Sequence, residues 1–323
     1  MHSTQTNSCC SAKRTAIAEV TEKNKDIHTL RPVVEKNNSK EDMVYIPGGH
    51  FLMGTDDKDG FPADGEGPIH KVSVKPFYMD KYAVTNRNFQ SFIEETGYVT
   101  EAELYGWSFV FHLFLSEAVI RKAPQKVQHT PWWIMVEGAN WKCPEGPESG
   151  LDRRLDHPVI HISWNDAKAY CKWANKRLPT EAEWEFAARG GLEQKKYAWG
   201  DELMPDGEHY CNIWQGEFPK SNTASDGFIG TAPTNSYHPN GYGLFNMAGN
   251  VWEWCSDWFV KNVNKRGGRY NPAGPHRGEE KVMRGGSYLC HESYCNRYRV
   301  AARTSNTPDS SSGNIGFRCA ADL

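Results

Sequence analysis

The sequence predicts an α+β fold with little regular secondary structure, in which short strands and long loops dominate and helices are few. The chain of 323 residues contains 29 glycines and 40 aromatic residues (12 Trp, 14 Tyr and 14 Phe), a balance that favours turns and packed rings over long helices. Its apolar runs are short and end at glycine or proline. From residue 199 onward the sequence is loop-like, and such stretches need cross-links such as metal ions or disulfides.

Two regions differ in composition. Residues 1–42 are mostly Lys, Glu, Asn, Ser and Thr, with too little apolar surface to form a core, so we expect a disordered tail. Residues 43–323 are expected to form one catalytic domain, since irregular folds rich in glycine and tryptophan can reach this length as one unit.

Strands are expected first in the N-terminal part of the domain. Residues 44–46 form a short apolar run that stops at Pro47, and a second run follows at residues 51–53. Residues 70–74 alternate between apolar and polar side chains, which predicts a third strand. Further strands are expected near the C-terminus, at residues 251–254, 282–287 and 316–320.

Three helices are predicted from capping signals and apolar spacing. The first covers residues 85–97, with Thr85 as its N-cap and a glycine as its terminator. The second covers about residues 165–176, where apolar side chains recur on one face. The third begins at Thr180, and Glu183 three residues later completes a capping box.

Composition also excludes some partners. The net charge of -3 and pI near 6.5 leave no basic surplus for phosphates, so no nucleic-acid partner is expected. The most apolar window, residues 107–115, is far shorter than the roughly 20 residues that cross a bilayer, so no membrane partner is expected. Residues 1–14 lack the apolar centre of a secretory signal, which favours a cytoplasmic protein.

The sharpest local pattern lies at residues 285–295, where Cys290 and Cys295 bracket His291 and follow two glycines. Two thiolates that converge can hold a soft ion such as Cu(I), or they can form a disulfide. The spacing alone leaves open a metal site, a disulfide and a pair of buried thiols.

A family resemblance extends over residues 43–323, where many ordered segments resemble the formylglycine-generating enzymes, also called sulfatase-modifying factors. The matching segments are residues 46–54, 131–133, 138–141, 157–159, 163–167, 176–185, 240–244, 249–254, 284–287 and 314–318. Residues 305–311 resemble the oxidase branch of this family in particular. The resemblance implies a formylglycine-generating-enzyme/C-type-lectin-like fold.

The resemblance also implies an activity. Cys290 and Cys295 match the family's catalytic cysteines, which hold Cu(I) until the substrate cysteine joins as a third sulfur ligand. The implied reaction uses O2 and a thiol reductant to convert the cysteine of a Cys-X-Pro-X-Arg motif into formylglycine. The implied partner is an unfolded or nascent type I sulfatase, bound extended in a surface groove. Four more residues match positions lining the family's active-site cleft: Ser287, Trp252, Tyr294 and Asn314. Core packing is the alternative for Trp252.

Calcium is the second cofactor that the resemblance implies, because oxygen ligands of mixed type suit this hard cation. One implied site consists of Asn212, Ile213, Asp226 and Phe228. The other consists of Asn246, Gly249, Val251 and Glu253. Without the resemblance, several of these residues read as ordinary turn residues.

The remaining cysteines divide by what the resemblance implies for them. Cys171 and Cys319 match a family disulfide, which would favour an oxidising compartment. A second family disulfide is absent, since Ala188 and Val300 occupy its positions. No role is assigned to Cys9, Cys10, Cys143, Cys211 and Cys255.

Two rival functions share the scaffold. A catalytically silent sulfatase-binding paralogue is disfavoured, because silent members lack the pair formed by Cys290 and Cys295. Sulfoxide synthases of this superfamily add an N-terminal helical domain with an iron-binding histidine cluster, for which a tail of residues 1–42 is too short.

Overall fold

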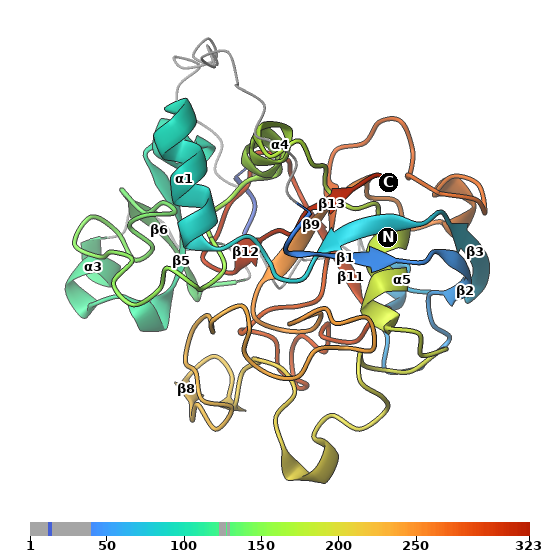
Figure 1. The fold of residues 1–323 in the computed structure, drawn as a ribbon. Helices are drawn as coiled ribbons and strands as arrows, with labels where there is room; N and C mark the ends of the chain where they lie inside the picture. The colour runs from blue at the N-terminus through green and yellow to red at the C-terminus, as the bar shows by residue number, and fades with distance from the viewer. Residues whose placement is uncertain (1–11, 15–39, 123–126, 128–129) are drawn as a thin grey trace, which may run out of the picture.

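The computed structural model describes residues 12–14, 40–122, 127 and 130–323, and it consists of small sheets, short helices and long connecting loops (Figure 1). This arrangement confirms the predicted fold class. Most of the predicted tail lies outside the described residues, but Ala12, Lys13 and Arg14 are described and lie against the domain. The domain boundary at residue 43 stays a prediction.

A four-stranded sheet lies at the centre of the molecule (Figure 1). Its strands lie in the order β11-β10-β9-β12, and β12 runs parallel to β9. Their bounds are β9 Trp252–Trp258, β10 Lys281–Arg284, β11 Arg303–Asn306 and β12 Ile315–Gly316.

The two ends of the domain meet in a three-stranded sheet, in which β4 pairs with both β1 and β13. Three two-stranded sheets complete the strands: β2-β3, β5-β6 and β7-β8. The bounds are β1 Met43–Ile46, β2 Gly49–Met53, β3 His70–Val74, β4 Phe77–Asp80, β5 Trp107–Phe111, β6 Trp133–Glu137, β7 Gly216–Glu217, β8 Ser221–Asn222 and β13 Ala320–Ala321.

Five α-helices occur in the described residues, and none exceeds 11 residues. They are α1 Asn86–Thr96, α2 Glu101–Tyr105, α3 Glu117–Lys122, α4 Trp164–Trp173 and α5 Glu181–Arg189. Thr85 and Thr180 are the predicted N-caps of α1 and α5, and both form capping boxes, although a box was predicted only for α5. In the described part of the chain, no helix is long and apolar enough to cross a membrane.

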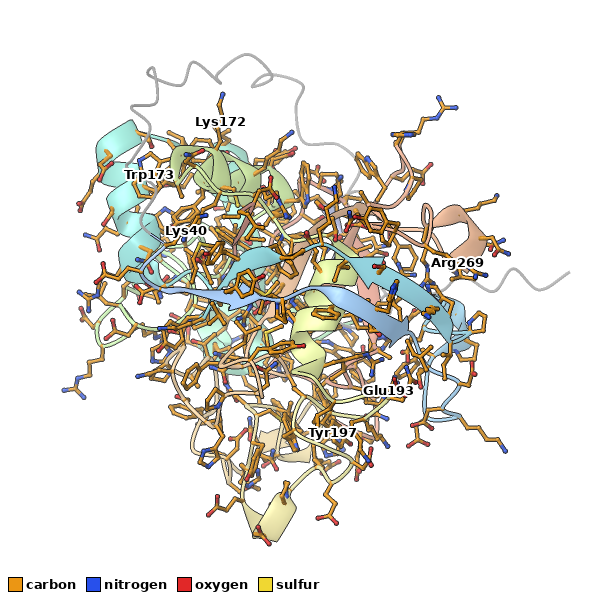
Figure 2. All side chains as sticks on the ribbon, turned by 45° about the vertical axis from the view of Figure 1, so that its right-hand side comes forward. Lys40, Lys172, Trp173, Glu193, Tyr197 and Arg269 are labelled. Atoms are coloured by element: carbon orange, nitrogen blue, oxygen red, sulfur yellow. The ribbon has the colours of Figure 1, made fainter. Side chains whose placement is uncertain are left out.

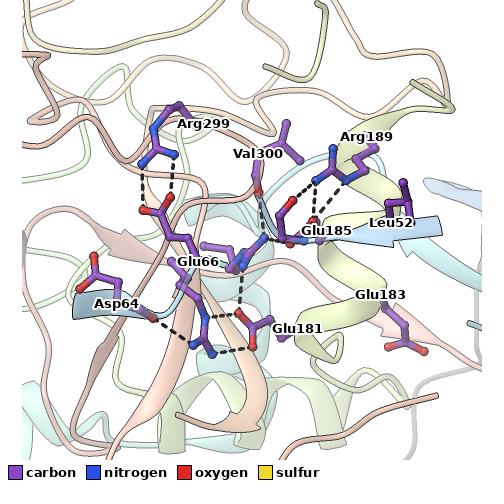
Figure 3. Close-up of polar contacts among 12 residues, drawn as sticks. Leu52, Asp64, Glu66, Glu181, Glu183, Glu185, Arg189, Arg299 and Val300 are labelled. Atoms are coloured by element: carbon purple, nitrogen blue, oxygen red, sulfur yellow. Dashed lines mark hydrogen bonds and ion pairs between the residues drawn. The ribbon is translucent and has the colours of Figure 1, made fainter. Parts of the chain in front are cut away.

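A buried network of charges joins the helical part to the central sheet (Figure 3). Glu181 and Glu185 lie four residues apart on α5 and therefore face the same side of the helix. Glu181 accepts hydrogen bonds from Arg284 (2.9 Å) on β10 and Arg303 (2.6 and 2.7 Å) on β11. Glu185 accepts from Arg284 (2.5 Å) and from Arg189 (2.7 Å).

The same network extends to the loop before β3, where Glu66 pairs with Arg299 at 2.6 and 2.8 Å (Figure 3). Removing one partner of such a buried pair leaves a charge without compensation, which typically costs about 3–5 kcal/mol. The network therefore fixes α5, β10 and β11 relative to one another. Figure 2 shows side chains filling the space between the loops, and the buried core contains aromatic rings alongside aliphatic side chains.

Candidate active site

A glycine turn directs the chain from the charged network into the cysteine loop. β10 ends at Arg284, and the next two residues adopt positive φ angles of 91° (Gly285) and 75° (Gly286). A Cβ atom on Gly286 would lie 2.9 Å from the carbonyl oxygen of Arg297, which is too close for any side chain. Glycine is therefore required where the loop of residues 287–295 begins.

Local hydrogen bonds fold this loop so that the two sulfur atoms meet. The amide of Cys290 donates to the carbonyl of Ser287 (2.9 Å), and the amide of Cys295 donates to the carbonyl of His291 (2.7 Å). The Sγ atoms of Cys290 and Cys295 lie 3.0 Å apart. Cys295 takes part in a disulfide bond. That bond is not with Cys290, since bonded sulfurs lie about 2.05 Å apart.

Arg297 supplies positive charge beside the pair, a contribution that the sequence reasoning missed. Its Nη1 lies 3.9 Å from Cys295 Sγ, and its Nε donates to Asp64 at 2.7 Å. A guanidinium beside a cysteine favours the thiolate, which is the form that binds metals and attacks substrates. Its only sequence signal is its place two residues after Cys295.

Ser287 and Asn314 lie behind the sulfur atoms and are linked to each other. Asn314 donates to Ser287 Oγ (3.1 Å), while the Ser287 amide lies 3.4 Å from Cys290 Sγ. The Asn314 carbonyl accepts from the amide of Trp252 (2.9 Å). These contacts bring together three of the four predicted pocket residues.

An aromatic cover of Trp132, Phe218 and Tyr294 closes the front of the site. Tyr294 stacks on Phe218 with ring centroids 4.6 Å apart, and Trp132 meets Tyr294 edge-on at 4.9 Å. Beneath the cover lies a cavity of about 10 Å³, which also borders Cys290 and Cys295. This volume is about that of a single water site. Both cysteines are only 1% exposed, so the open peptide groove expected at the sulfurs is not present in the described structure.

Two residues near the sulfur pair, Trp252 and His291, do not line the small cavity. Trp252 is fully buried in the core cluster that contains both cysteines and does not line the small cavity, which favours its packing role. The half-buried His291 contacts its neighbour Ser293 through Nδ1 at 2.8 Å. The histidine between the two cysteines thus contacts a neighbouring side chain of the same loop.

The donor set fits a soft ion. Two sulfur atoms 3.0 Å apart can both bond one metal ion once Cys295 is reduced, and thiolates are the ligands that Cu(I) prefers. Among the described residues, no group of three or more His, Cys, Asp and Glu side chains could hold a metal ion. Within the described part of the chain, the protein therefore offers two sulfur ligands here.

In the first predicted calcium site, two of the predicted residues contact the carboxylate of a third, whereas Asn212 donates to Gly230 and Asn250. Asp226 accepts from the amides of Ile213 (3.0 Å) and Phe228 (3.2 Å). Burial raises the pKa of Asp226, and the described residues include no ion-pair partner for it. A bound cation would compensate this buried carboxylate, so the residues fit calcium.

The second predicted calcium site fits less completely. Asn246 Oδ1 is buried without a hydrogen-bond partner among the described residues, as expected for an atom that awaits a ligand. However, Glu253 accepts from Arg318 through both oxygens (2.7 Å each) and from Trp184 (2.7 Å). Since Arg318 already neutralises this carboxylate, the structure favours the first site over the second.

The other cysteines differ chemically from the central pair. Cys171 and Cys319 lie in contact, with sulfurs 3.6 Å apart, but both thiols are free, so their disulfide stays a prediction. Cys211 and Cys255 are buried free thiols whose pKa values are raised by burial. Ala188 and Val300 are both buried apolar residues. The half-buried Cys143 is free as well, and Cys9 and Cys10 lie outside the described residues.

Comparison with known structures supports the fold. PvdO from Pseudomonas aeruginosa matches with a TM-score of 0.62 and 25% identity, covering 91% of this chain and 99% of that one. Small sheets and long loops thus place this protein in the class of formylglycine-generating-enzyme-like folds.

Sequence comparison then identifies the family. Residues 30–323 match the family described as the sulfatase-modifying factor enzyme 1-like domain, and the chain belongs to it. A formylglycine-generating enzyme of Thermomonospora curvata is 59% identical over 289 residues, covering 87% of this chain and 93% of the relative. A Bos taurus relative named inactive C-alpha-formylglycine-generating enzyme 2 is 48% identical over 287 residues, covering 88% of this chain and 89% of the relative.

Proposed function

We propose that this protein is a formylglycine-generating enzyme that modifies unfolded or nascent type I sulfatases. Its substrate is the cysteine of a Cys-X-Pro-X-Arg motif, and Cu(I), O2 and a thiol reductant take part. The observation that carries the proposal is the approach of Cys290 and Cys295 to 3.0 Å beside a cavity lined by aromatic rings. The names of the closely similar relatives support it.

The proposed reaction balances without an organic cofactor. The substrate CH2–SH group is oxidised to a thioaldehyde, and hydrolysis then replaces its sulfur by an oxygen atom of water and releases H2S. O2 is reduced to two molecules of water, because it takes two electrons from the substrate and two from two molecules of the thiol reductant, which become a disulfide. Bound Cu(I) supplies the one-electron chemistry that activates O2.

The residues of the chain prepare this chemistry. Once the reductant has opened the disulfide at Cys295, Cys290 and Cys295 would hold the ion. Arg297 places a positive charge beside Cys295 Sγ. Ser287 and Asn314 position the loop. The aromatic cover excludes water and must move aside when a peptide enters, since the cavity holds no more than about one water.

Calcium has a structural role in this proposal. Asn212, Ile213, Asp226 and Phe228 bind the first ion, and Asn246, Gly249, Val251 and Glu253 are the candidates for the second. Each ion stabilises loops and takes no part in the reaction.

A silent sulfatase-binding paralogue is the rival function, and the relative named inactive is similar enough to require a test. The thiol pair favours the enzyme, since a binding protein has no need of two converging sulfurs. The proposed Cys171–Cys319 disulfide stabilises both alternatives equally and does not discriminate between them.

Mass analysis of a peptide product tests the proposal. The reduced protein is incubated with Cu(I), O2, a thiol reductant and a peptide that contains Cys-X-Pro-X-Arg. We expect the peptide to lose mass by the difference between a thiol and an aldehyde, and Cys290→Ser or Cys295→Ser to abolish the change. Cys143→Ser, a half-buried thiol outside the site, serves as the matched control. An unchanged peptide with the wild-type protein would contradict the oxidase assignment.

A further inference from the structure

Arg14 precedes the predicted catalytic domain, and its side chain is bound by several hydrogen bonds and by two aromatic rings. Its Nε donates to the carbonyl of Asp309 (2.8 Å), and its Nη2 donates to Ser311 Oγ (2.9 Å) and to the carbonyl of Trp107 (3.0 Å). The guanidinium lies 4.2 Å from the ring centroids of both Tyr105 and Trp107. The arginine cradle therefore consists of Tyr105, Trp107 and residues 309–311.

The chemistry of the arginine cradle selects a guanidinium. A planar cation that stacks on aromatic rings and donates to several fixed acceptors is an arginine, because a lysine ammonium offers neither the plane nor the fork of donors. Arg14 is only 5% exposed. Burial lowers its pKa to about 10, although the nearby Tyr105 and Asp309 oppose this shift. The side chain therefore remains charged at neutral pH.

The hydrogen-bonding capacity of the Arg14 guanidinium is not fully used. This is what we expect of a side chain that another arginine can displace. Nη1 is buried without a hydrogen-bond partner in the described structure, and no carboxylate contacts the guanidinium directly. A buried cation that lacks such a partner gives up part of its solvation without full compensation. Another arginine can therefore replace Arg14 in the cradle.

The residues before Arg14 lead toward the sulfur site. The Arg14 amide donates to Ser310 Oγ (2.9 Å), and the Ala12 carbonyl accepts from Asn306 (3.1 Å). Ala12 is buried in an apolar cluster that also contains Trp107, Trp133 and Leu289. Trp133 and Leu289 also line the cavity beside Cys290 and Cys295. Ala12 thus joins the arginine cradle to the walls of the reaction site.

The sequence around Arg14 resembles the proposed substrate. Residues 10–14 read Cys-Ser-Ala-Lys-Arg, which has the cysteine and the arginine of Cys-X-Pro-X-Arg at the same spacing, with Ala12 in place of proline. The family match begins at residue 30, so this motif belongs to the part of the chain outside it.

We propose that residues 12–14 occupy the arginine cradle in cis as a substrate-like segment, and that they compete there with the arginine of the incoming sulfatase motif. This inference rests on the proposed function, because that function supplies the motif. A tethered segment acts at an effective concentration on the order of millimolar, so even a weak internal competitor lowers the apparent affinity for an external peptide.

Peptide binding tests the competition without any catalysis. The probe is a fluorescent peptide with Ser-X-Pro-X-Arg, in which serine prevents the reaction, and binding to the full-length protein is followed by anisotropy. Arg14→Ala should bind the probe at least about fivefold more tightly than the wild type, because the internal competitor is lost. Arg87→Ala, an exposed arginine elsewhere on the domain, should bind as the wild type does. Equal or weaker binding by Arg14→Ala would overturn the proposal.

A second variant tests the arginine cradle itself. In the Arg14→Ala background, Trp107→Ala should weaken binding of the arginine probe about tenfold, in line with a lost stacking partner. The same change should leave binding of a probe with alanine in place of arginine unaltered. If Trp107→Ala weakens both probes equally, the cradle is not an arginine site. Equal melting temperatures of the variants exclude a folding defect as the cause.

Turnover of the cysteine peptide separates the two proposals. With the enzyme active, Arg14→Ala should lower the apparent KM by the same factor as in the binding assay and leave kcat nearly unchanged. If the binding assays succeed but no variant converts the peptide, the oxidase proposal fails and the arginine site stands. If conversion occurs with equal KM in both proteins, the oxidase proposal stands and the internal competitor is excluded.

Discussion

The charged network around α5 and the sulfur site at residues 287–295 are both buried, but they are built in opposite ways. Every carboxylate of the network accepts from at least one arginine, and Glu181 accepts from Arg284 and Arg303 together. The sulfur site is bordered by the aromatic cover. Stability and reactivity are thus assigned to different regions of one interior.

The contrast explains how an irregular chain holds a reactive pair in place. Burial raises the pKa of Glu181, but Arg303 and Arg284 outweigh it and hold the value at about 2. At pH values above the usual pKa of a glutamate, the carboxylate therefore stabilises the folded state. This contribution is lost as the pH falls toward 2. Arg284 ends the strand that precedes the glycine turn, so the network anchors the loop that carries Cys290 and Cys295.

The largest effect is expected when the network is broken. Glu181→Ala should lower the free energy of unfolding by about 3–5 kcal/mol, because two buried guanidiniums lose their carboxylate. Urea unfolding monitored by tryptophan fluorescence measures the loss. Glu217→Ala, which removes an exposed pair with Lys220, should change stability by less than about 1 kcal/mol. Comparable losses in both variants would remove the distinction between the network and ordinary surface pairs.

Calcium removal should give the next largest effect. If Asp226 binds calcium, saturating the ion at about 100 times its Kd stabilises the fold by about 2.7 kcal/mol. A calcium chelator should therefore lower the Tm of the wild type measured by calorimetry. Asp226→Asn should start at a lower Tm and not respond to the chelator. An unchanged Tm for the wild type would argue against the ion.

Asp257 provides a pH-dependent test of the network. Burial and the charge of Glu181 raise its pKa from 3.8 to about 7, so the folded state holds its proton more tightly than the unfolded state. This contribution is fully present below pH 4 and is lost as the pH rises through about 7. Between pH 5 and pH 8, the stability of Asp257→Asn should therefore rise relative to that of the wild type by about 2–3 kcal/mol. Denaturant unfolding of both proteins at pH 5 and pH 8 checks this prediction. An equal difference in the free energy of unfolding at the two pH values would contradict it.

The smallest effect concerns the aromatic cover. Tyr294→Leu removes the stack on Phe218, which is worth about 1 kcal/mol, and should raise the KM for the peptide about fivefold if the cover contacts the substrate. Steady-state turnover measures this change. Tyr270→Leu, at a ring that is 63% exposed, is the control. A fall in kcat with constant KM would place Tyr294 in the reaction step instead.

The elements that the sequence predicted well are those with a local signal. Helix α1 begins after Thr85 and ends before Gly97, as its caps indicate. Helix α2 was missed, although Thr100 and Glu103 form the same capping box, because five residues are too few to show an apolar period. Residues 316–320 were expected as one strand, but Gly316 pairs with β9 and Ala320 with β4. Such a change of sheet leaves no mark on local alternation.

Prediction of the site residues from the sequence was limited in the same way. The family resemblance pointed to Cys290 and Cys295, and the structure brings their sulfurs together. It did not point to Arg297, whose partner Asp64 lies 233 residues away, or to Arg14, whose partners lie near residue 310. Contacts of this kind depend on how loops cross one another in the fold, and no local spacing encodes them.

Copper stoichiometry tests the central claim most directly, because it reports on the sulfur pair independently of turnover. The reduced protein is titrated with Cu(I) without oxygen, and bound metal is measured after removal of weakly held ions. We predict one copper ion per chain for the wild type and for Cys143→Ser, and none for Cys290→Ser or Cys295→Ser. Retention of copper by the two site variants would contradict the claim that these sulfurs form the metal site.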